Sequence, residues 1–507
     1  MMHSAKLTCL LHLKTKIITI PKLSLKMPET FMHPYRGAYI VAITFLVALA
    51  VLSVVFYKER MLFVDPCWII FNIINTGTFC IAEHRYGAFI TQMCPVIGVH
   101  LGWSLRTILI IYSASFYVFY LAAAIITGYV WRQHWLSILL VIYLTLFVSD
   151  VYYWPNNEVH QGVAWMVLFL GYYIHTARHG RKNIIKHAVL FLLAFLAIFS
   201  HLIVLLPFTF LWLYYHTTQH NKLELLLKNR LFIWYSSLIA ALIGARYLLS
   251  SSGWYDSIKL QRIHDISLPI IIQSFSSGQS QSFLQLLLHN YWIALPFFLL
   301  GLLYLLKNKC SFQIALLIIY TATYYMLICI TYPDAFGRSL RFYMESEWMA
   351  LSIIMMTPFV IDMIPAFRQK SLIPSLFILI FSIRILYILE SFSYFNNRYT
   401  ALEKITVQLQ AQDIKKALIV QDKATADSIF IMDWGLPAES MMLSVIKGFE
   451  PPVTFKVITP DFIITQPRDS FYSCFDLQAI SRLNSKYFQP DTTQPYLIIP
   501  ISTVNSE

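Results

Sequence analysis

Acidic residues with aromatic neighbours are the part of this sequence best suited to chemistry. Asp65 stands directly before Pro66, and Asp150 and Glu158 enclose the aromatic segment 152–154. A positioned carboxylate can accept the proton of an attacking hydroxyl, which typically contributes a factor of about 100 to 10,000 to the rate. We therefore take Asp65, Asp150 and Glu158 as candidate catalytic residues. The structural alternatives are a helix cap for Asp65 and a polar turn in an aromatic belt for the other two.

Cationic and aromatic residues near these acids could bind a substrate. The candidates are Arg85, His160, Arg246, Arg338, Arg341 and Tyr343. Arginine suits a phosphate because its planar fork donates two parallel hydrogen bonds and keeps its charge. Arg338 and Arg341 lie in one polar loop, so we predict that they form a phosphate site. The alternative for Arg341 is an ion pair with Glu345, one helical turn away.

Two arginines lie inside apolar runs, where an unpaired charge would cost on the order of 2 to 3 kcal/mol. Arg246 is in the outer part of one run, and Arg384 is within the last run. Each charge must therefore be neutralised. For Arg384 we expect a structural role, in which the side chain reaches the interface or meets a buried acid. His201 is expected to be a satisfied core histidine.

The sequence predicts no metal site. Glu158 and His160 are two residues apart, which does not place them on one face of a helix. The seven cysteines include no pair at zinc spacing. We expect that the protein requires no cofactor. The sequence neither indicates nor excludes the binding of a divalent cation.

The composition is that of a membrane protein. Hydrophobic residues make up 58% of the chain and charged residues only 13%, against roughly 25% charged in soluble domains, and the mean hydropathy is +0.61. The net charge of +12 comes from short basic clusters between apolar runs. A nucleic-acid partner is not expected, because such proteins concentrate basic residues in a patch or stripe. Membrane lipids are the expected surroundings.

The apolar runs predict about eleven transmembrane helices in a domain over residues 38–390. Residues 1–37 form an N-terminal segment without an assigned fold. The run 187–216 is too long for one span, and Ser200, His201 and Pro207 divide it into two. The predicted runs are 38–57, 106–130, 134–153, 160–176, 187–216, 231–250, 286–306, 311–331, 347–364 and 372–389.

Charge in the connecting loops predicts the orientation. Alternate loops hold clusters of Lys and Arg with Glu224 as their one acid, whereas the loops between them hold most of the acids. Lys and Arg favour the cytoplasmic side. The N-terminus is therefore expected in the cytoplasm, and an odd number of spans puts residues 391–507 outside. Low cysteine use and a short cytoplasmic face fit a bacterial inner membrane.

The first outer loop and the tail are the segments expected to be structured outside the membrane. Residues 58–105 predict two amphipathic helices in the interface plane, one starting at Asp65 and one from Glu83 to Met93. In the tail, strands are predicted at 416–420, 429–432, 454–458 and 462–465, with helices at 402–410 and 438–448. The fold class is thus an all-α membrane protein with a small extracytoplasmic α/β domain.

This arrangement resembles the GT-C superfamily of membrane glycosyltransferases, which includes protein mannosyltransferases and the lipid A aminoarabinose transferase. The likeness rests on the first span, the acid Asp65 shortly after it, the long first outer loop and the C-terminal domain. It implies transfer of a sugar from a polyprenyl-phosphate carrier to a lipid, glycan or protein acceptor at the outer face. Asp65 would then be the general base.

Two other functions compete with the transferase. A transporter or flippase would fit the many spans, although no internal repeat is visible and the ionisable residues gather at one face. A polymerase or ligase of surface polysaccharide also uses lipid-linked donors. The tail turn 432–435 (Met-Asp-Trp-Gly) either contacts an acceptor or belongs to a stabilising domain.

Overall fold

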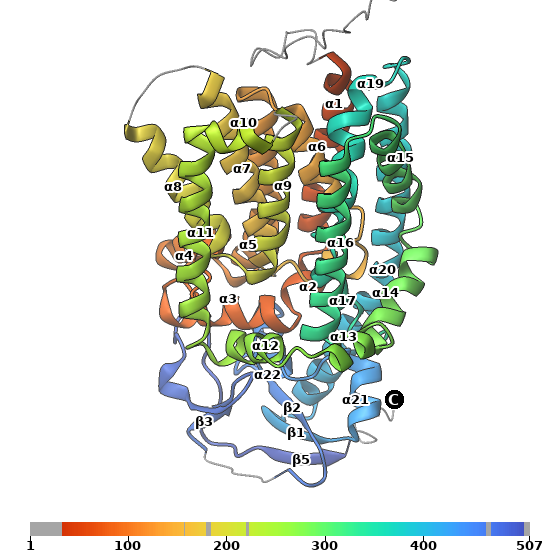
Figure 1. Ribbon diagram of the computed structural model, residues 1–507. Helices are drawn as coiled ribbons and strands as arrows, with labels where there is room; N and C mark the ends of the chain where they lie inside the picture. The colour runs from red at the N-terminus through yellow and green to blue at the C-terminus, as the bar shows by residue number, and fades with distance from the viewer. Residues whose placement is uncertain (1–32, 157, 179–183, 220–222, 463–467, 501–507) are drawn as a thin grey trace, which may run out of the picture.

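The computed structural model describes residues 33–156, 158–178, 184–219, 223–462 and 468–500. Helices run side by side along most of the molecule, and a small domain with strands closes one end (Figure 1). The first helix, α1 (His33–Val55), begins at the opposite end. Residues 1–32 of the predicted N-terminal segment lie outside the described residues.

Five helices are long and apolar enough to cross a membrane. Three further pairs of helices pass the same test but are bent, so the described residues contain at most eight spans. These helices indicate an integral membrane protein, and the prediction of eleven spans is wrong. The five are α1, α5 (Leu105–Ile125) with the π-helical turn η3 (Ile126–Val130), α11 (Arg230–Ser250), α16 (Ser311–Thr331) and α20 (Leu372–Ala411).

The predicted span 134–153 is a half-helix. Its helix, α6 (His134–Tyr143), ends ten residues early, and the chain that follows turns through η4 (Asp150–Tyr153). Arg384 stabilises this break, because its guanidinium donates to the carbonyl oxygens of Thr145 (3.1 Å) and Val148 (2.7 Å). Irregular backbone at membrane depth needs such partners. Arg384 thus has a structural role, but its partners are backbone carbonyl oxygens and not the interface or the buried acid that we expected.

Three apolar stretches are bent pairs. In the first, α8 (Ile184–Ile198) meets η5 (Leu202–Val204) and α9 (Leu205–Gln219) at 119°, which confirms the predicted break at Ser200-His201. The second joins α13 (Leu268–Ser274) and α14 (Gly278–His289) to α15 (Ala294–Lys307) at 89°. The third joins α17 (Arg341–Trp348) to α18 (Leu351–Pro358), η6 (Phe359–Met363) and α19 (Ile364–Ala366) at 43°.

The segment 58–105 contains two helices of similar length, although the second begins six residues later than predicted. After α2 (Tyr57–Met61), α3 (Val64–Thr76) lies crosswise to the bundle, as does α12 (Trp254–His264) (Figure 1). The second helix is α4 (Phe89–Leu101), preceded by η2 (Tyr86–Ala88), and it continues past Pro95. The remaining helices of the bundle are α7 (Glu158–Arg178) and α10 (Leu223–Lys228).

The C-terminal domain is built on the end of α20. That helix has 40 residues and is therefore about 60 Å long, so it leaves the bundle and packs into the domain. The predicted domain boundary at residue 391 lies within it. Parallel strands form a sheet in the order β2-β1-β5, from β1 (Lys416–Val420), β2 (Thr454–Ile458) and β5 (Leu497–Pro500). An antiparallel pair, β3 (Ser470–Tyr472) and β4 (Leu477–Ala479), lies beside it, followed by η7 (Ile480–Arg482).

Two of the four strands predicted in the tail are confirmed, at 416–420 and 454–458. The strand predicted at 429–432 is wrong, because its first two residues are the end of α21 (Lys423–Phe430), a helix capped by Asp422, and the next two are not in a strand. Residues 463–467 lie outside the described residues, so most of the fourth strand is untested. The helix predicted at 438–448 is α22 (Leu436–Ile446).

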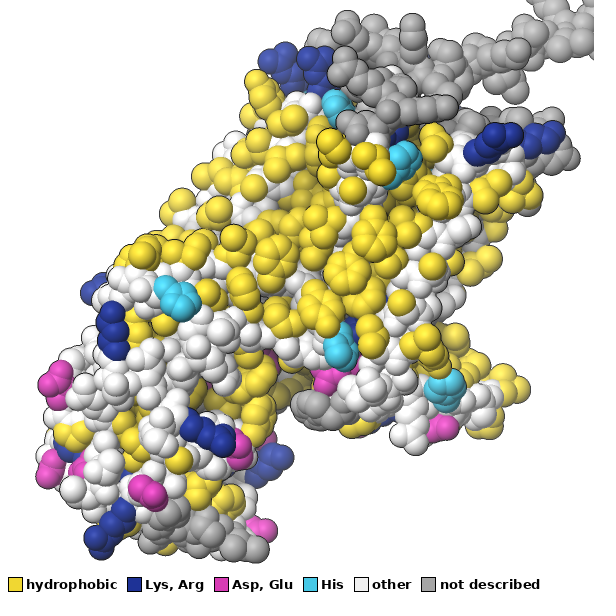
Figure 2. Space-filling model, turned by 90° about the vertical axis from the view of Figure 1, so that its left-hand side faces the viewer, with side chains coloured by type: hydrophobic (Ala, Val, Ile, Leu, Met, Phe, Trp, Pro, Cys, Tyr) yellow, Lys and Arg dark blue, Asp and Glu magenta, His cyan; other side chains and the backbone are white. Residues whose placement is uncertain are grey.

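The surface reflects this division. Figure 2 shows hydrophobic side chains over the middle of one face, with Lys and Arg at the α1 end. Most of the Asp and Glu side chains on this face lie at the other end, on the C-terminal domain and near it. A hydrophobic belt between two polar ends is the surface expected of a bilayer-spanning protein.

Candidate functional site

A cavity of about 470 Å³ lies where the helical bundle meets the C-terminal domain. Its walls come from α3, the segment 82–85, the start of α7, α12, α17 and two turns of the C-terminal domain. Four acids line it: Asp65, Glu83, Glu158 and Glu347. Its aromatic residues are Trp68, Trp154, Tyr255, Phe342, Tyr343, Trp434 and Phe475. Such a mixture of aromatic walls and a few convergent polar groups is typical of a ligand site.

Asp65 is a half-buried carboxylate in the wall of this cavity. Its Oδ2 accepts a hydrogen bond from Trp154 Nε1 at 2.9 Å. Burial raises the pKa of Asp65 to about 6, although the Trp154 hydrogen bond opposes that rise. The N-cap position of α3 is Phe63, without a side-chain cap bond, so the predicted helix cap is wrong. Asp65 instead points its carboxylate at the cavity wall formed by the aromatic segment.

The C-terminal domain holds the backbone next to Asp65. Val64 has a φ of 28°, a strained conformation for a β-branched residue. Its N–H donates to Glu439 Oε1 at 2.8 Å, and Glu439 Oε2 pairs with Arg398 at 2.6 Å. Arg398 also donates to the carbonyl oxygens of Leu62 (2.8 Å) and Phe430 (2.6 Å). Arg398 and Glu439 are therefore positioning residues for the start of α3.

Replacing Gly435 by Ala is expected to destabilise this junction by roughly 1 to 3 kcal/mol. A Cβ there would overlap the fixed Glu439 carboxylate and lie 3.0 Å from Val64 Cα. Thermal unfolding in detergent measures the effect. Gly244→Ala is the matched control, because nothing lies within 4 Å of its added Cβ and its helix should gain up to about 1 kcal/mol. Equal stability of both variants would contradict this view of the junction.

Arg85 and Glu158, both predicted site residues, form an ion pair at the cavity. Arg85 Nη1 lies 2.8 Å from Glu158, and Nη2 lies 2.9 Å from Asp256. Arg246 approaches the second oxygen of Asp256 at 2.7 Å, which explains how a charge inside α11 is neutralised. Of these four residues, only Arg85 and Glu158 line the cavity.

Glu83 anchors the helix that carries Asp256. Its carboxylate accepts from the backbone N–H groups of Tyr255 (3.2 Å) and Asp256 (3.5 Å) in the first turn of α12. A Cβ on Gly253 would overlap that carboxylate, so the close approach needs a glycine. Acids are favourable at a helix N-terminus. Glu83 therefore has a structural role, although it lines the cavity.

Glu347 is a cavity acid that the sequence analysis missed. Its side chain is buried, and Oε2 has no hydrogen-bond partner among the described residues. Tyr343, a predicted substrate-binding residue, lines the cavity beside it and shares a hydrogen bond with Tyr255. Glu345 faces the bundle and Glu347 faces the cavity. The sequence does not indicate this difference, because the two acids are only two residues apart.

The structure does not bring Asp150, Arg338 and Arg341 to the cavity. Arg338 pairs with Asp150, whose other oxygen accepts from Ser391 at 2.7 Å. Arg341 pairs with Glu345 at 3.1 Å. This is the ion pair that the sequence analysis gave as the alternative to a phosphate site. Both arginines therefore lie outside the cavity and pair with acids there, and the phosphate site proposed for them stays a prediction.

Glu345 and His160 are buried in the bundle instead. Glu345 accepts from the backbone N–H groups of Ser149 (2.9 Å) and Val151 (2.8 Å), so it fixes the turn after the half-helix α6. His160 shares a 2.6 Å hydrogen bond with Tyr143 and lies outside the cavity. His201 is buried and accepts a hydrogen bond from the Ile203 N–H at 3.2 Å, as expected of a core histidine, and it also lines the cavity.

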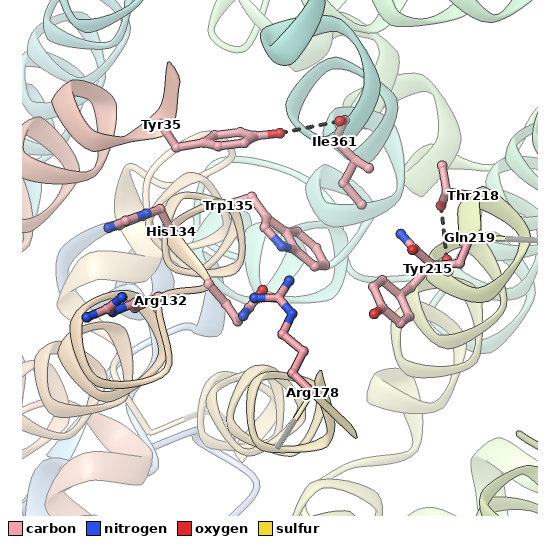
Figure 3. Close-up of a pocket in the computed structure, with 10 residues that line it drawn as sticks. Tyr35, Arg132, His134, Trp135, Arg178, Tyr215, Thr218, Gln219 and Ile361 are labelled. Carbon is pink, nitrogen blue, oxygen red and sulfur yellow. Dashed lines mark hydrogen bonds between the residues drawn. The ribbon is translucent and has the colours of Figure 1, made fainter. Parts of the chain in front are cut away.

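A second pocket of about 40 Å³ lies at the α1 end of the bundle. Figure 3 shows Arg132, His134 and Arg178 around this pocket, and Tyr35 donates to the carbonyl oxygen of Ile361 at 3.3 Å. No carboxylate is among the described residues that line this pocket. Its charged side chains are the arginines Arg132 and Arg178, which belong to the basic segments at that end.

No group of three or more His, Cys, Asp or Glu in the described ranges is arranged to hold a metal ion. No protein-family model, curated protein or solved structure matches this chain. The candidate site is therefore argued from its own geometry.

Proposed function

We propose that this chain is a membrane glycosyltransferase of the GT-C type, which moves a sugar from a polyprenyl-phosphate carrier to an acceptor hydroxyl. The acceptor oxygen bonds to the anomeric carbon as the bond from that carbon to the phosphate oxygen breaks. Asp65 takes the hydroxyl proton, and polyprenyl phosphate leaves. The observation that carries the proposal is Asp65 itself, a carboxylate with a pKa of about 6 in an aromatic cavity. A base is most effective when its pKa is near the working pH.

The position of the cavity supports a lipid-linked donor. The cavity adjoins the crosswise helices α3 and α12, at the end of the bundle where the C-terminal domain begins (Figure 1). A carrier lipid in the bilayer could thus present its headgroup to Asp65 without leaving the membrane. Aromatic rings at the cavity wall suit the apolar faces of a sugar ring.

We assign the carrier phosphate to Arg85 in place of Arg338 and Arg341. Arg85 lines the cavity, and its Nε is buried without a partner among the described residues. Glu158 and Asp256 hold the two terminal nitrogens, so the guanidinium is fixed before substrate arrives. A preorganised charge of this kind loses little entropy on binding.

For localisation we propose a bacterial inner membrane, with the N-terminus in the cytoplasm and the C-terminal domain outside. The support is the charge asymmetry of the two ends: Arg132 and Arg178 line the pocket at the α1 end, and acids line the cavity at the other. Lys and Arg are retained preferentially on the cytoplasmic side.

The experiment compares the native host with wild-type, deleted and Asp65→Asn alleles. Envelope glycans and polyprenyl-phosphate sugars are measured by mass spectrometry. We expect deletion and Asp65→Asn to lose the same sugar mass from the envelope and to accumulate the same lipid-linked sugar. Unchanged glycans and unchanged carrier lipids in both strains would refute the transferase.

The pH dependence of transfer tests the role of Asp65. The base acts only when deprotonated, so the rate is expected to fall about tenfold per unit below the pKa of about 6 and to level off above it. Trp154→Phe removes a hydrogen bond to the charged form, which raises the pKa and moves the inflection to higher pH. Trp434→Phe is the control. Trp434 also lines the cavity but makes no hydrogen bond to Asp65, so the inflection should stay at the wild-type pH. An inflection that does not respond to Trp154→Phe would show that another group titrates.

A further inference from the structure

A polar groove continues from the cavity along α3. It has a volume of about 230 Å³ and lies between α3 and the C-terminal segment around β3 and β4. Trp68 and Phe475 line both the cavity and the groove. The polar side chains of the groove are Asn72, Asn75, Thr76, Ser473, Asp476, Gln478 and Arg482. The two spaces are thus neighbours that share one aromatic boundary.

One face of α3 serves both spaces. Asp65, Trp68, Asn72 and Asn75 are spaced by three, four and three residues, the spacing that aligns side chains on one side of a helix. The first two line the cavity, and the last three line the groove. Ten residues of helix span about 15 Å. The track from the base to the far end of the groove is therefore long enough for an extended chain of sugar rings.

Asn72 and Arg482 keep groups that can bind a ligand in the groove, whereas Asn75 accepts from the Asn484 N–H at 2.9 Å. Asn72 Nδ2 donates to the carbonyl oxygen of Trp68 at 2.8 Å, which leaves its amide oxygen open. Gln478 donates to Asp476 at 3.1 Å. The Arg482 guanidinium has no hydrogen bond or ion pair among the residues that the structure describes. Planar amide, carboxylate and guanidinium groups can each bond two neighbouring hydroxyls at once.

Phe475 forms a platform at the boundary. Its side chain is 61% exposed, yet its ring stacks on Trp434 at 4.8 Å and meets Trp68 at 6.0 Å between ring centroids. An exposed aromatic ring held by two tryptophans offers a rigid apolar face. A sugar ring in passage from the groove to Asp65 would lie against it.

On these grounds, and resting on the proposed transferase function, we propose that the acceptor is a saccharide chain bound along α3. Its reducing-side rings occupy the groove, and its terminal ring passes Phe475 to present a hydroxyl to Asp65. A lipid acceptor would need an apolar channel, whereas this groove is lined by amides, a carboxylate and a guanidinium. A peptide acceptor is the alternative that the experiment must separate.

The test measures acceptor kinetics with full-length protein in liposomes. The donor is the lipid extract of the deletion strain, and the acceptor probe is the oligosaccharide fraction released from its envelope by mild acid. Asn72→Leu and Arg482→Leu are expected to raise the acceptor KM about tenfold, the loss of one or two hydrogen bonds, with kcat nearly unchanged. Arg468→Leu is the control, an exposed arginine of the same domain outside the groove.

The outcomes separate the two proposals. Loss of transfer in Asp65→Asn with an unchanged acceptor KM in both groove variants would overturn the saccharide groove alone. Full transfer in Asp65→Asn would overturn the transferase mechanism. Periodate, which cleaves vicinal diols, should destroy the acceptor probe, and protease should leave it active. The reverse result would identify a peptide and overturn the proposal.

Discussion

Replacing Asp65 by Asn is expected to slow sugar transfer in washed membranes by about 100- to 10,000-fold. The amide keeps the shape of the side chain and can still meet Trp154, but it cannot take a proton. Protein level and unfolding temperature should match the wild type, because the carboxylate is half-buried and makes no ion pair among the described residues. The measurement is the initial rate of sugar incorporation at pH 7.5.

Asp461→Asn is the matched control for this variant. Asp461 is an exposed carboxylate of the C-terminal domain, outside the cavity, so the same chemical change there should leave the rate unchanged. A rate within threefold of wild type in Asp65→Asn would contradict its role as the base. An equal loss in both variants would point to a general effect of charge on this face.

The Arg398→Met variant is expected to lose roughly 3 to 5 kcal/mol of stability, because it leaves Glu439 buried without a cation. Arg398 and Glu439 are 2% and 0% exposed in their side chains, and Arg398 joins α20 to the chain before α3 and to the C-terminal domain. The measurement is unfolding in detergent, followed by the exposure of the C-terminal domain to protease. Arg398→Met with Glu439→Met should recover much of the loss, since no unpaired charge remains.

An exposed ion pair in the same region gives the comparison. Lys447 pairs with Glu403 while 31% and 28% of their side chains are exposed, and such pairs contribute about 0 to 1 kcal/mol. Lys447→Met should therefore change stability little. If Arg398→Met were no more damaging than Lys447→Met, the C-terminal domain would not depend on the buried pair.

The sequence predicted elements whose signal is local. The apolar run 311–331 is α16 at the same bounds, and the strands at 416–420 and 454–458 are β1 and β2, because each pattern is continuous and has clear ends. The run 134–153 is equally apolar, yet it breaks after Tyr143. The cause is Arg384, which lies more than 200 residues further along the chain. Hydropathy reports neither such a partner nor the bends in the three helix pairs, and the predicted number of spans was therefore too high.

The same limit applies to the site. Asp65 could be found, because an acid before Pro66 after the first span is a local feature. The pairing of Arg341 with Glu345 is local and was one of the two alternatives in the sequence, whereas Asp150, which pairs with Arg338, lies 188 residues away. Trp434 stands in the tail turn for which the sequence left acceptor contact and a stabilising role open, whereas Phe475 carried no signal in the sequence. Their place beside Trp68 depends on how the C-terminal domain packs onto α3.

The most direct test of the central claim is donor consumption by the purified protein. Wild-type and Asp65→Asn proteins are placed in liposomes with the lipid extract of the deletion strain, and mass spectrometry follows the polyprenyl-phosphate sugar over time. The account predicts that the wild type, given the released oligosaccharides, converts that species to polyprenyl phosphate and that Asp65→Asn does not. Persistence of the lipid-linked sugar with both proteins, or equal consumption by both, would contradict it.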